Sequence, residues 1–249
     1  MNIEQVTFRE HDHKYFSVEG KELISTSTLV SLYKPVFDPT GAILARCAEK
    51  EGKTIEELQA EWDKKRIDAA DRGTSFHKQA EEWVKTRQAP TGTDKDIVEQ
   101  LTKFKFRGRI HAETIVAASS LGIAGTVDLI DEYGNNELDV WDYKTNKELK
   151  KKGFFDRKTR RFSKMLYPIS HLDDCNFIHY SLQQEIYAII LEENGYWVND
   201  KTLLYINPKT REIERHPVMS LRKEALTIIN HYKNRGKPKA NVALDPFDF

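Results

Sequence analysis

Cysteine is scarce in this sequence. Only Cys47 and Cys175 occur among 249 residues, and no short spacing joins them. The pattern argues against a disulfide framework and is typical of a protein from a reducing compartment. We expect both cysteines to be ordinary core residues.

Net charge and targeting signals are also lacking. Lys plus Arg equal Asp plus Glu at 39 each, so the overall charge indicates no partner and any basic surface must be local. The N-terminus lacks a basic and then apolar signal pattern, and no apolar run approaches the length of a membrane span. We expect a cytoplasmic protein with no membrane partner.

An ATP-binding loop is absent as well. Gly52-Lys53-Thr54 resembles the end of a phosphate-binding loop, but that pattern needs a glycine where Cys47 stands, and no strand precedes it. We therefore expect no ATP. Thr54 and Glu57 instead predict a capping box for a helix that runs to about Ala70.

The chain length suits one domain with its own core, and no linker divides it. Apolar periodicity and turn residues predict its elements. In chain order these are a hairpin over 6–24, a short helix capped within 25–28, a helix started by Asp38 and Pro39, helices over 72–83 and 94–106, a strand over 110–118, a hairpin over 124–144, a helix over 178–193, strands over 202–206 and 212–218, and a helix capped by Ser220 that runs to about Lys233.

The clearest chemical signal lies in the hairpin over 124–144. Side chains alternate across a strand, so Asp142 and Lys144 point the same way, and Asp128 on the partner strand completes the group. Two carboxylates beside an ammonium suit a hard metal ion. The alternative is an ordinary surface ion pair. Charge at the end of an apolar strand is costly unless it is paired or used, which favours a functional site.

Two helices supply further polar candidates. His77 and Glu81 lie one turn apart on the helix over 72–83, and Gln183 and Tyr187 lie one turn apart on the helix over 178–193. A lone histidine on a helix is more often structural than functional. His77 is therefore a candidate site residue only in combination with the other polar candidates. A buried glutamine needs hydrogen-bond partners, which makes Gln183 a credible part of a site wall.

A basic stretch follows the hairpin. From Lys144 to Lys164 the chain holds ten Lys and Arg against two acids, with phenylalanines interleaved. Such a run can be a solvated surface, but cations and aromatic rings are also what a nucleic-acid groove requires. The residues that we expect to contact DNA are Lys147, Lys150, Lys151, Lys152, Arg157, Arg160, Arg161 and Phe162.

Four motifs occur in a fixed order: Gly-Thr-x-x-His at 73–77, Gly-x-x-Asp at 125–128, Asp-x-Lys at 142–144 and Gln-x-x-x-Tyr at 183–187. In this order they resemble the RecB-like branch of the PD-(D/E)XK nuclease superfamily, over roughly residues 72–191. The segment 167–176 is similar to phage-encoded exonucleases of this branch. The segment 25–29 with Phe37-Asp38 is similar to the mitochondrial genome-maintenance exonuclease type.

The resemblance implies particular roles. His77, Asp128 and Asp142 would bind the metal with the Tyr143 carbonyl, and Lys144 would position or activate water. The further residues implied are Gln183 and Tyr187 as site lining that touches substrate, and Glu81 as a carboxylate behind the ligands. Asp142 replaces the more frequent Glu, Gln184 stands where a leucine is usual, and two cysteines are too few for the iron–sulfur cluster of some members.

The resemblance implies an α/β fold with a mixed central sheet flanked by helices, and we expect a single domain over 1–249. Its nuclease core would cover 72–219, with an N-terminal part over 1–71 and a C-terminal part over 220–249. The expected function is exonucleolytic hydrolysis of DNA with Mg²⁺ or Mn²⁺, with a recombination or single-strand-binding protein as an open choice of partner. The alternatives are an endonuclease of the same superfamily and a DNA-binding module without catalysis.

Overall fold

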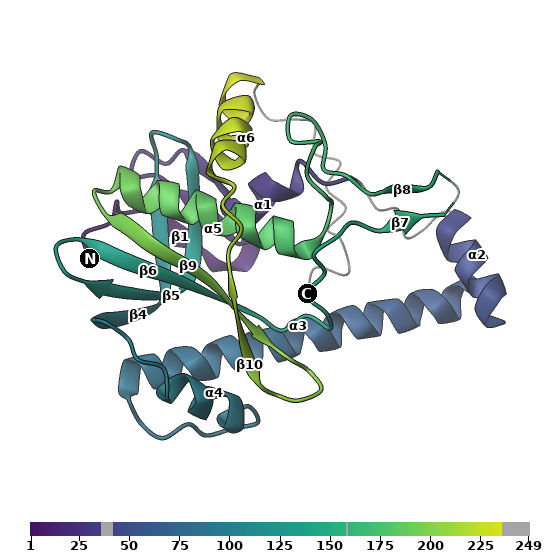
Figure 1. Ribbon diagram of the computed structural model, residues 1–249, viewed down its shortest axis with the longest axis horizontal. Helices are drawn as coiled ribbons and strands as arrows, with labels where there is room; N and C mark the ends of the chain where they lie inside the picture. Colours follow the sequence, from purple (N-terminus) through teal and green to yellow (C-terminus); the bar gives the residue numbers. More distant parts are fainter. Residues whose placement is uncertain (36–41, 158, 236–249) are drawn as a thin grey trace.

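A mixed β-sheet forms the centre of the protein (Figure 1). The computed structural model describes residues 1–35, 42–157 and 159–235, and within these the sheet has eight strands in the order β1-β2-β3-β5-β6-β9-β10, with β4 paired to β5. The strands are β1 Thr7–Arg9, β2 Lys14–Phe16, β3 Glu22–Ser25, β4 Arg109–Ala118, β5 Ile123–Tyr133, β6 Glu137–Lys144, β9 Trp197–Ile206 and β10 Ile213–Pro217.

The central strands form both antiparallel and parallel pairs. β4 and β6 both run antiparallel to β5, whereas β3 pairs with β5 and β9 pairs with β6 in parallel. The parallel pair β6 and β9 is joined by the crossover helix α5 (Asn176–Glu193), as parallel strands require. The structure confirms the predicted α/β class with a mixed central sheet flanked by helices.

Helices cover both faces of the sheet (Figure 1). On one face α5 packs with α1 (Thr26–Ser31) and α6 (Arg222–Arg235), and on the other lie α3 (Ile55–Thr86) and α4 (Lys95–Thr102). The alternation predicted for β6 is observed, because Val140 belongs to the α5 side of the core and Trp141 to the α3 side. Within the described residues, no helix combines the length and apolar composition needed to span a bilayer.

The helix α3 corrects one prediction. The sequence predicts a helix ending near Ala70 and another starting at Arg72, but the structure has one helix of 32 residues. Its start is confirmed: the Glu57 amide donates to Thr54 Oγ1 at 3.1 Å, and the Thr54 amide donates to Glu57 Oε2 at 2.9 Å. Gly73 stays helical, where a Cβ would lie 3.3 Å from Thr145 Oγ1. The glycine therefore marks a close approach of the helix to the chain just after β6, and not a break.

Smaller differences concern bounds and burial. The final helix begins at Arg222, one residue later than a cap at Ser220 predicts, and α4 is shorter than predicted. Cys175 is buried as expected, whereas Cys47 is half-buried against a small cluster between α2 (Ala42–Glu51) and the start of α3. The predicted helix start at Asp38 and Pro39, with Phe37, lies outside the described residues.

A short hairpin not foreseen from the sequence lies within the basic stretch. β7 (Phe155–Asp156) pairs antiparallel with β8 (Arg161–Phe162) as a separate two-stranded sheet. It projects from the body of the molecule at the right of Figure 1. Two-residue strands give no periodicity to detect, so only the charge and aromatic content of this segment were visible in the sequence.

Candidate active site

Strands β5 and β6 separate at the two aspartates. Their pairing ends with Leu129 opposite Trp141, so the next position would place Asp128 opposite Asp142. There the Tyr143 amide donates to Asp128 Oδ2 at 2.7 Å instead of to a strand carbonyl. Beyond this point β5 stays paired with β4 and β6 with β9. The sheet therefore opens between its central strands, and both carboxylates lie in the opening.

The two aspartates are buried, and their pKa values are raised. Asp142 is only 1% exposed. Burial and, to a lesser extent, the nearby Asp128 charge raise its pKa to about 6, against the lowering effect of the Lys144 ammonium. Burial likewise raises the pKa of Asp128, although the His77 and Lys144 charges oppose the shift. Each carboxylate therefore depends on nearby cations to stay ionised.

Lys144 is the first of these cations. Its Nζ lies 2.7 Å from Asp142 Oδ2 and 4.4 Å from the centroid of the Tyr180 ring. Burial alone would lower the pKa of Lys144, but the Asp142 and Asp128 carboxylates outweigh burial and raise it. The Tyr180 hydroxyl donates to Asn146 Oδ1 at 2.6 Å, which fixes the ring under the ammonium. Lys144 is thus a charged and well-positioned donor at neutral pH.

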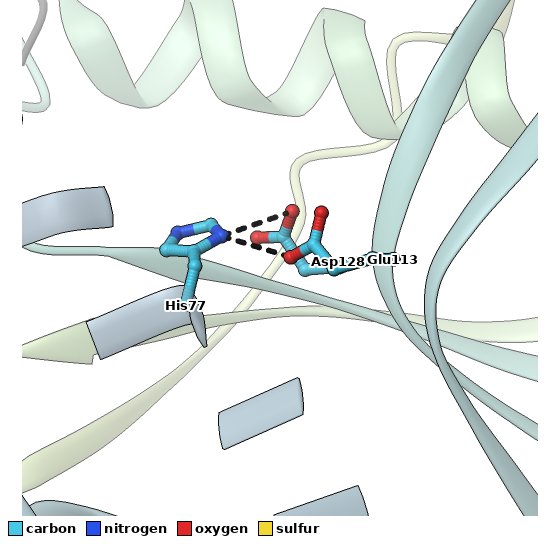
Figure 2. A group of neighbouring side chains, drawn as sticks. All are labelled: His77, Glu113 and Asp128. Carbon is cyan, nitrogen blue, oxygen red and sulfur yellow. Dashed lines mark hydrogen bonds and ion pairs between the residues drawn. The ribbon is translucent and has the colours of Figure 1, made fainter. Parts of the chain in front are cut away.

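His77 reaches the same opening from α3. Its Nδ1 lies 3.2 Å from Glu113 Oε1 and 3.6 Å from Asp128 Oδ1 (Figure 2). Burial lowers the pKa of His77, but the Asp128 and Glu113 carboxylates outweigh it and raise the pKa to about 9. Without a metal, the imidazole is therefore a second cation among the carboxylates.

Glu113 is a site residue that sequence reasoning missed. It lies in β4 between Ala112 and Thr114, which pair with β5 on either side of Asp128, and its φ of 46° is left-handed. Such a backbone is uncommon for a residue other than glycine, and it turns the Glu113 carboxylate toward His77 and Asp128 (Figure 2). A signal was available, because Glu113 is the one acid in the strand predicted over 110–118.

The three side chains form a group that fits a metal ion. One donor atom each of His77, Glu113 and Asp128 lie within 4.8 Å of one another. Two carboxylates and an imidazole suit Mn²⁺ and, with the oxygen donors dominant, Mg²⁺. The structure therefore brings together two of the four predicted ligands and adds Glu113. Asp142 instead pairs with Lys144, and the ligand roles of Asp142 and the Tyr143 carbonyl stay predictions.

Helix α5 closes the site from the other face of the sheet. Gln183 Nε2 donates to the Tyr187 hydroxyl at 3.0 Å, as their one-turn spacing allows. Burial raises the pKa of Tyr187 well above its ordinary value, and the Asp142 and Asp128 charges add to the shift. Tyr187 therefore lies within electrostatic reach of both aspartates, and its role as a residue that lines the site and touches substrate stays a prediction.

Gly125 explains the glycine of the Gly-x-x-Asp motif. A Cβ at this position would lie 2.7 Å from Tyr187 Cε1 and 2.9 Å from Thr26 Oγ1, closer than real Cβ contacts. Only glycine lets α5 and α1 approach β5 at this point. Gly125, which precedes Asp128 by three residues, thus sets the position of Tyr187.

The remaining predicted residues lie further out. Glu81 forms an ion pair with Lys85 on the outer part of α3, and its role behind the metal ligands stays a prediction. The basic residues are exposed, and two of them lie over aromatic rings. Lys151 Nζ lies 5.2 Å from the centroid of the Phe177 ring, and Lys152 Nζ lies 5.8 Å from the centroid of the Phe162 ring. The exposed set comprises Lys147, Lys150, Lys151, Lys152, Arg157, Arg160, Arg161 and Phe162.

Comparisons with known proteins add little. No protein-family model matches the chain, and no curated protein matches it. Among solved structures, SSO0001 is 16% identical over 85% of this chain and 73% of that one, with a TM-score of 0.37. A protein described as a candidate exonuclease from Eubacterium rectale is 12% identical over 81% of this chain and 67% of that one, with a TM-score of 0.37. Likenesses this weak carry no argument about function.

The Gly125 contact yields a stability prediction. Gly125→Ala should lower the free energy of unfolding by about 1–3 kcal/mol, because the added methyl overpacks the core against Tyr187. Gly73→Ala is the comparison variant: its position is helical and the added methyl would meet one side-chain atom, Thr145 Oγ1, at 3.3 Å, so its effect on the free energy of unfolding should be smaller than that of Gly125→Ala. Equal stability of the two variants in urea unfolding would contradict the contact.

The support under Lys144 is open to a second test. Tyr180→Phe keeps the ring below the ammonium but removes the donor to Asn146, leaving a buried acceptor unpaired. The free energy of unfolding should fall by about 1–3 kcal/mol. In an Asn146→Ala background the same change should cost far less, because the pair is already broken. Additive losses in this cycle of urea unfolding curves would show that the two residues are not coupled.

Proposed function

We propose that this protein is a metal-dependent nuclease that hydrolyses phosphodiester bonds of DNA from a free end. The observation that carries the proposal is the convergence of His77, Glu113 and Asp128 donor atoms within 4.8 Å, beside the Asp142 and Lys144 pair. These residues, apart from Glu113, also carry the motifs that resemble RecB-like nucleases. Residues 72–219 would form the nuclease core of a single domain.

The charge of the site supports a divalent cation. Three carboxylates, on Glu113, Asp128 and Asp142, face the single permanent cation of Lys144, and the His77 proton offsets part of the excess. When a metal ion binds to His77, the imidazole loses its proton and becomes neutral. The three carboxylates and the Lys144 ammonium then carry a net charge of about −2, which a divalent ion balances. Asp142 and the Tyr143 carbonyl would complete the ligands.

The protein's own groups divide the work around the metal. A bound Mg²⁺ or Mn²⁺ supplies Lewis-acid polarisation of the phosphoryl oxygens and lowers the pKa of a bound water. In the metal-free site the Asp142 and Asp128 carboxylates raise the pKa of Lys144, so we assign Lys144 as a hydrogen-bond donor that orients the attacking water or a phosphoryl oxygen. The Gln183 and Tyr187 pair lines the opening on the α5 side and contacts substrate.

Substrate binding falls to the basic stretch. The exposed side chains of the loop over 147–152 and of the β7-β8 hairpin lie along the segment that leaves β6 directly after Lys144. Cations on this path can neutralise successive phosphates of a DNA strand that enters the site. Action from an end follows from the likeness to phage and mitochondrial exonucleases, and a recombination or single-strand-binding protein is the kind of partner that would deliver such an end.

The ligand set gives the central prediction. Glu113→Gln should weaken Mn²⁺ binding more than about tenfold, because loss of a direct ligand exceeds the effect of changing a residue behind the ligands. Cleavage of end-labelled DNA with Mg²⁺ or Mn²⁺ should be abolished as well. Glu82→Gln is the matched control, since this carboxylate is exposed on the same helix α3 and has no assigned role in the site, and it should change Mn²⁺ affinity less than about twofold. Titration calorimetry or electron paramagnetic resonance measures the affinity.

The same preparations test the reaction class. Wild-type protein should shorten linear single- or double-stranded DNA and leave a covalently closed circle intact. Ca²⁺ should bind with little turnover, because its looser coordination does not align the attacking water. Wild-type Mn²⁺ affinity in Glu113→Gln would remove Glu113 from the site, efficient nicking of the circle would indicate an endonuclease, and DNA binding without cleavage under any metal would indicate a binding module.

The basic loop predicts a salt effect. Replacing Lys150, Lys151 and Lys152 together with glutamine should weaken binding to all sequences alike. It should also flatten the slope of log K against log salt by roughly 0.7 to 0.9 per lost phosphate contact. The rate at saturating DNA should change little. Replacement of the exposed Lys103, Lys105 and Arg109 with glutamine serves as the control. Equal salt slopes for the two triple variants would show that the loop over 150–152 is an ordinary solvated surface.

A further inference from the structure

Three large aromatic side chains are exposed on one small hairpin. Phe154 is 78% exposed, Phe155 44% and Phe162 41%, although the proposed role in binding phosphates needs no aromatic ring. Apolar side chains grouped on a surface mark an interaction site more often than scattered ones do. The β7-β8 hairpin that carries them therefore needs a function of its own.

The hairpin is built to hold these rings in place. Phe155 and Phe162 are register partners whose ring centroids lie 5.1 Å apart, and the Ser163 amide donates to the Phe154 carbonyl at 2.7 Å. A Cβ on Gly153 would lie 2.2 Å from the Ser163 carbonyl oxygen, so only glycine permits this approach. Phe155 and Phe162 thus stabilise each other, and Phe154 stands beside them as the most exposed ring.

The base of the hairpin is fixed to the start of α5. The Asp174 amide donates to the Ser163 carbonyl at 3.0 Å, and Ser163 Oγ donates to Asp174 Oδ2 at 2.9 Å. The loop before the hairpin is held at the same place, because the Lys150 amide donates to Asn176 Oδ1 at 2.8 Å. The rings are therefore carried on a braced platform that continues the chain from Lys144.

The surroundings of the rings are strongly cationic. Lys152 Nζ lies 5.8 Å from the Phe162 centroid, and Arg157, Arg160 and Arg161 are exposed on the same hairpin. An apolar protein surface would not match these charges, and a second copy of this hairpin would repel it. A ligand that offers negative charge and flat apolar faces at once matches both features, and a nucleic-acid strand with unstacked bases is such a ligand.

We infer that the β7-β8 hairpin is a stacking platform for the unpaired bases of single-stranded DNA. The inference rests on the proposed nuclease function and adds its substrate class. Phe154 stacks on a base while the neighbouring Lys and Arg side chains neutralise the adjacent phosphates. Duplex DNA offers the same phosphates but keeps its base faces covered by neighbouring bases, so the platform discriminates between single and double strands.

Substitution of Phe154 tests the platform, because its ring is the most exposed of the three. Phe154→Ala should weaken binding of a fluorescent oligo-dT by about 5- to 150-fold, which corresponds to about 1–3 kcal/mol per stacked base at 1.4 kcal/mol per tenfold. Binding of a fluorescent duplex should change less than about twofold. Trp197→Ala, which removes a ring that is 68% exposed beyond the other end of α5, should change neither. Phe154→Trp should keep or strengthen binding of oligo-dT.

Fluorescence anisotropy in metal-free buffer makes this test independent of catalysis. Loss of oligo-dT binding by Phe154→Ala, with thermal unfolding as in the wild type, supports the platform even if no metal yields cleavage, in which case only the nuclease proposal fails. Unchanged oligo-dT binding, or equal loss for oligo-dT and duplex, overturns the inference. If either of these two results were obtained while the wild type cleaves DNA, the nuclease proposal would hold and only the platform would be rejected.

Discussion

The separation of β5 and β6 is the constraint on which the site depends. A regular antiparallel ladder would pair Asp128 with Asp142 and direct the Tyr143 amide to a strand carbonyl. Here that amide donates to the Asp128 side chain, so one carboxylate oxygen satisfies the backbone group that the opening exposes. The sheet stays intact on both sides because β4 and β9 continue to pair with the separated strands. An opening inside a sheet gives helices from both faces access to one point.

Charge balance inside this opening explains how each group holds the others. An unpaired buried carboxylate shifts its pKa upward and loses its charge, which would remove it as a ligand. Lys144 and His77 oppose that shift for Asp128 and Asp142. The Tyr180 ring in turn supports the ammonium with an electron-rich face while itself fixed by Asn146. Packing and electrostatics here are one network, and the aromatic residues of α5 take part in both.

Much of this arrangement could be predicted from the sequence, because it follows from short-range geometry. Strand alternation placed Asp142 and Lys144 together, and a helical turn placed Gln183 beside Tyr187. The predictions that were wrong or incomplete depend on contacts between residues far apart in the sequence. Gly73 allowed either a helix break or a close contact, and only the packing of Thr145 against it distinguishes the two. Glu113 was missed because a strand residue with left-handed backbone breaks the alternation on which the prediction relied.

The backbone of Glu113 also bears on how such a site persists through mutation. A left-handed residue other than glycine costs of order 1–3 kcal/mol, and Glu113 retains this conformation in the middle of a strand. Replacement by glycine would release that cost and at the same time delete a carboxylate from the opening. The ion pair with His77 at 3.2 Å and the higher backbone entropy of an unfolded glycine oppose this gain, so the net effect of the replacement on stability is smaller than the strain alone. Of the carboxylates in the opening, Glu113 is thus the one held at the expense of its own backbone, whereas Asp142 is buried in a regular strand and compensated by Lys144.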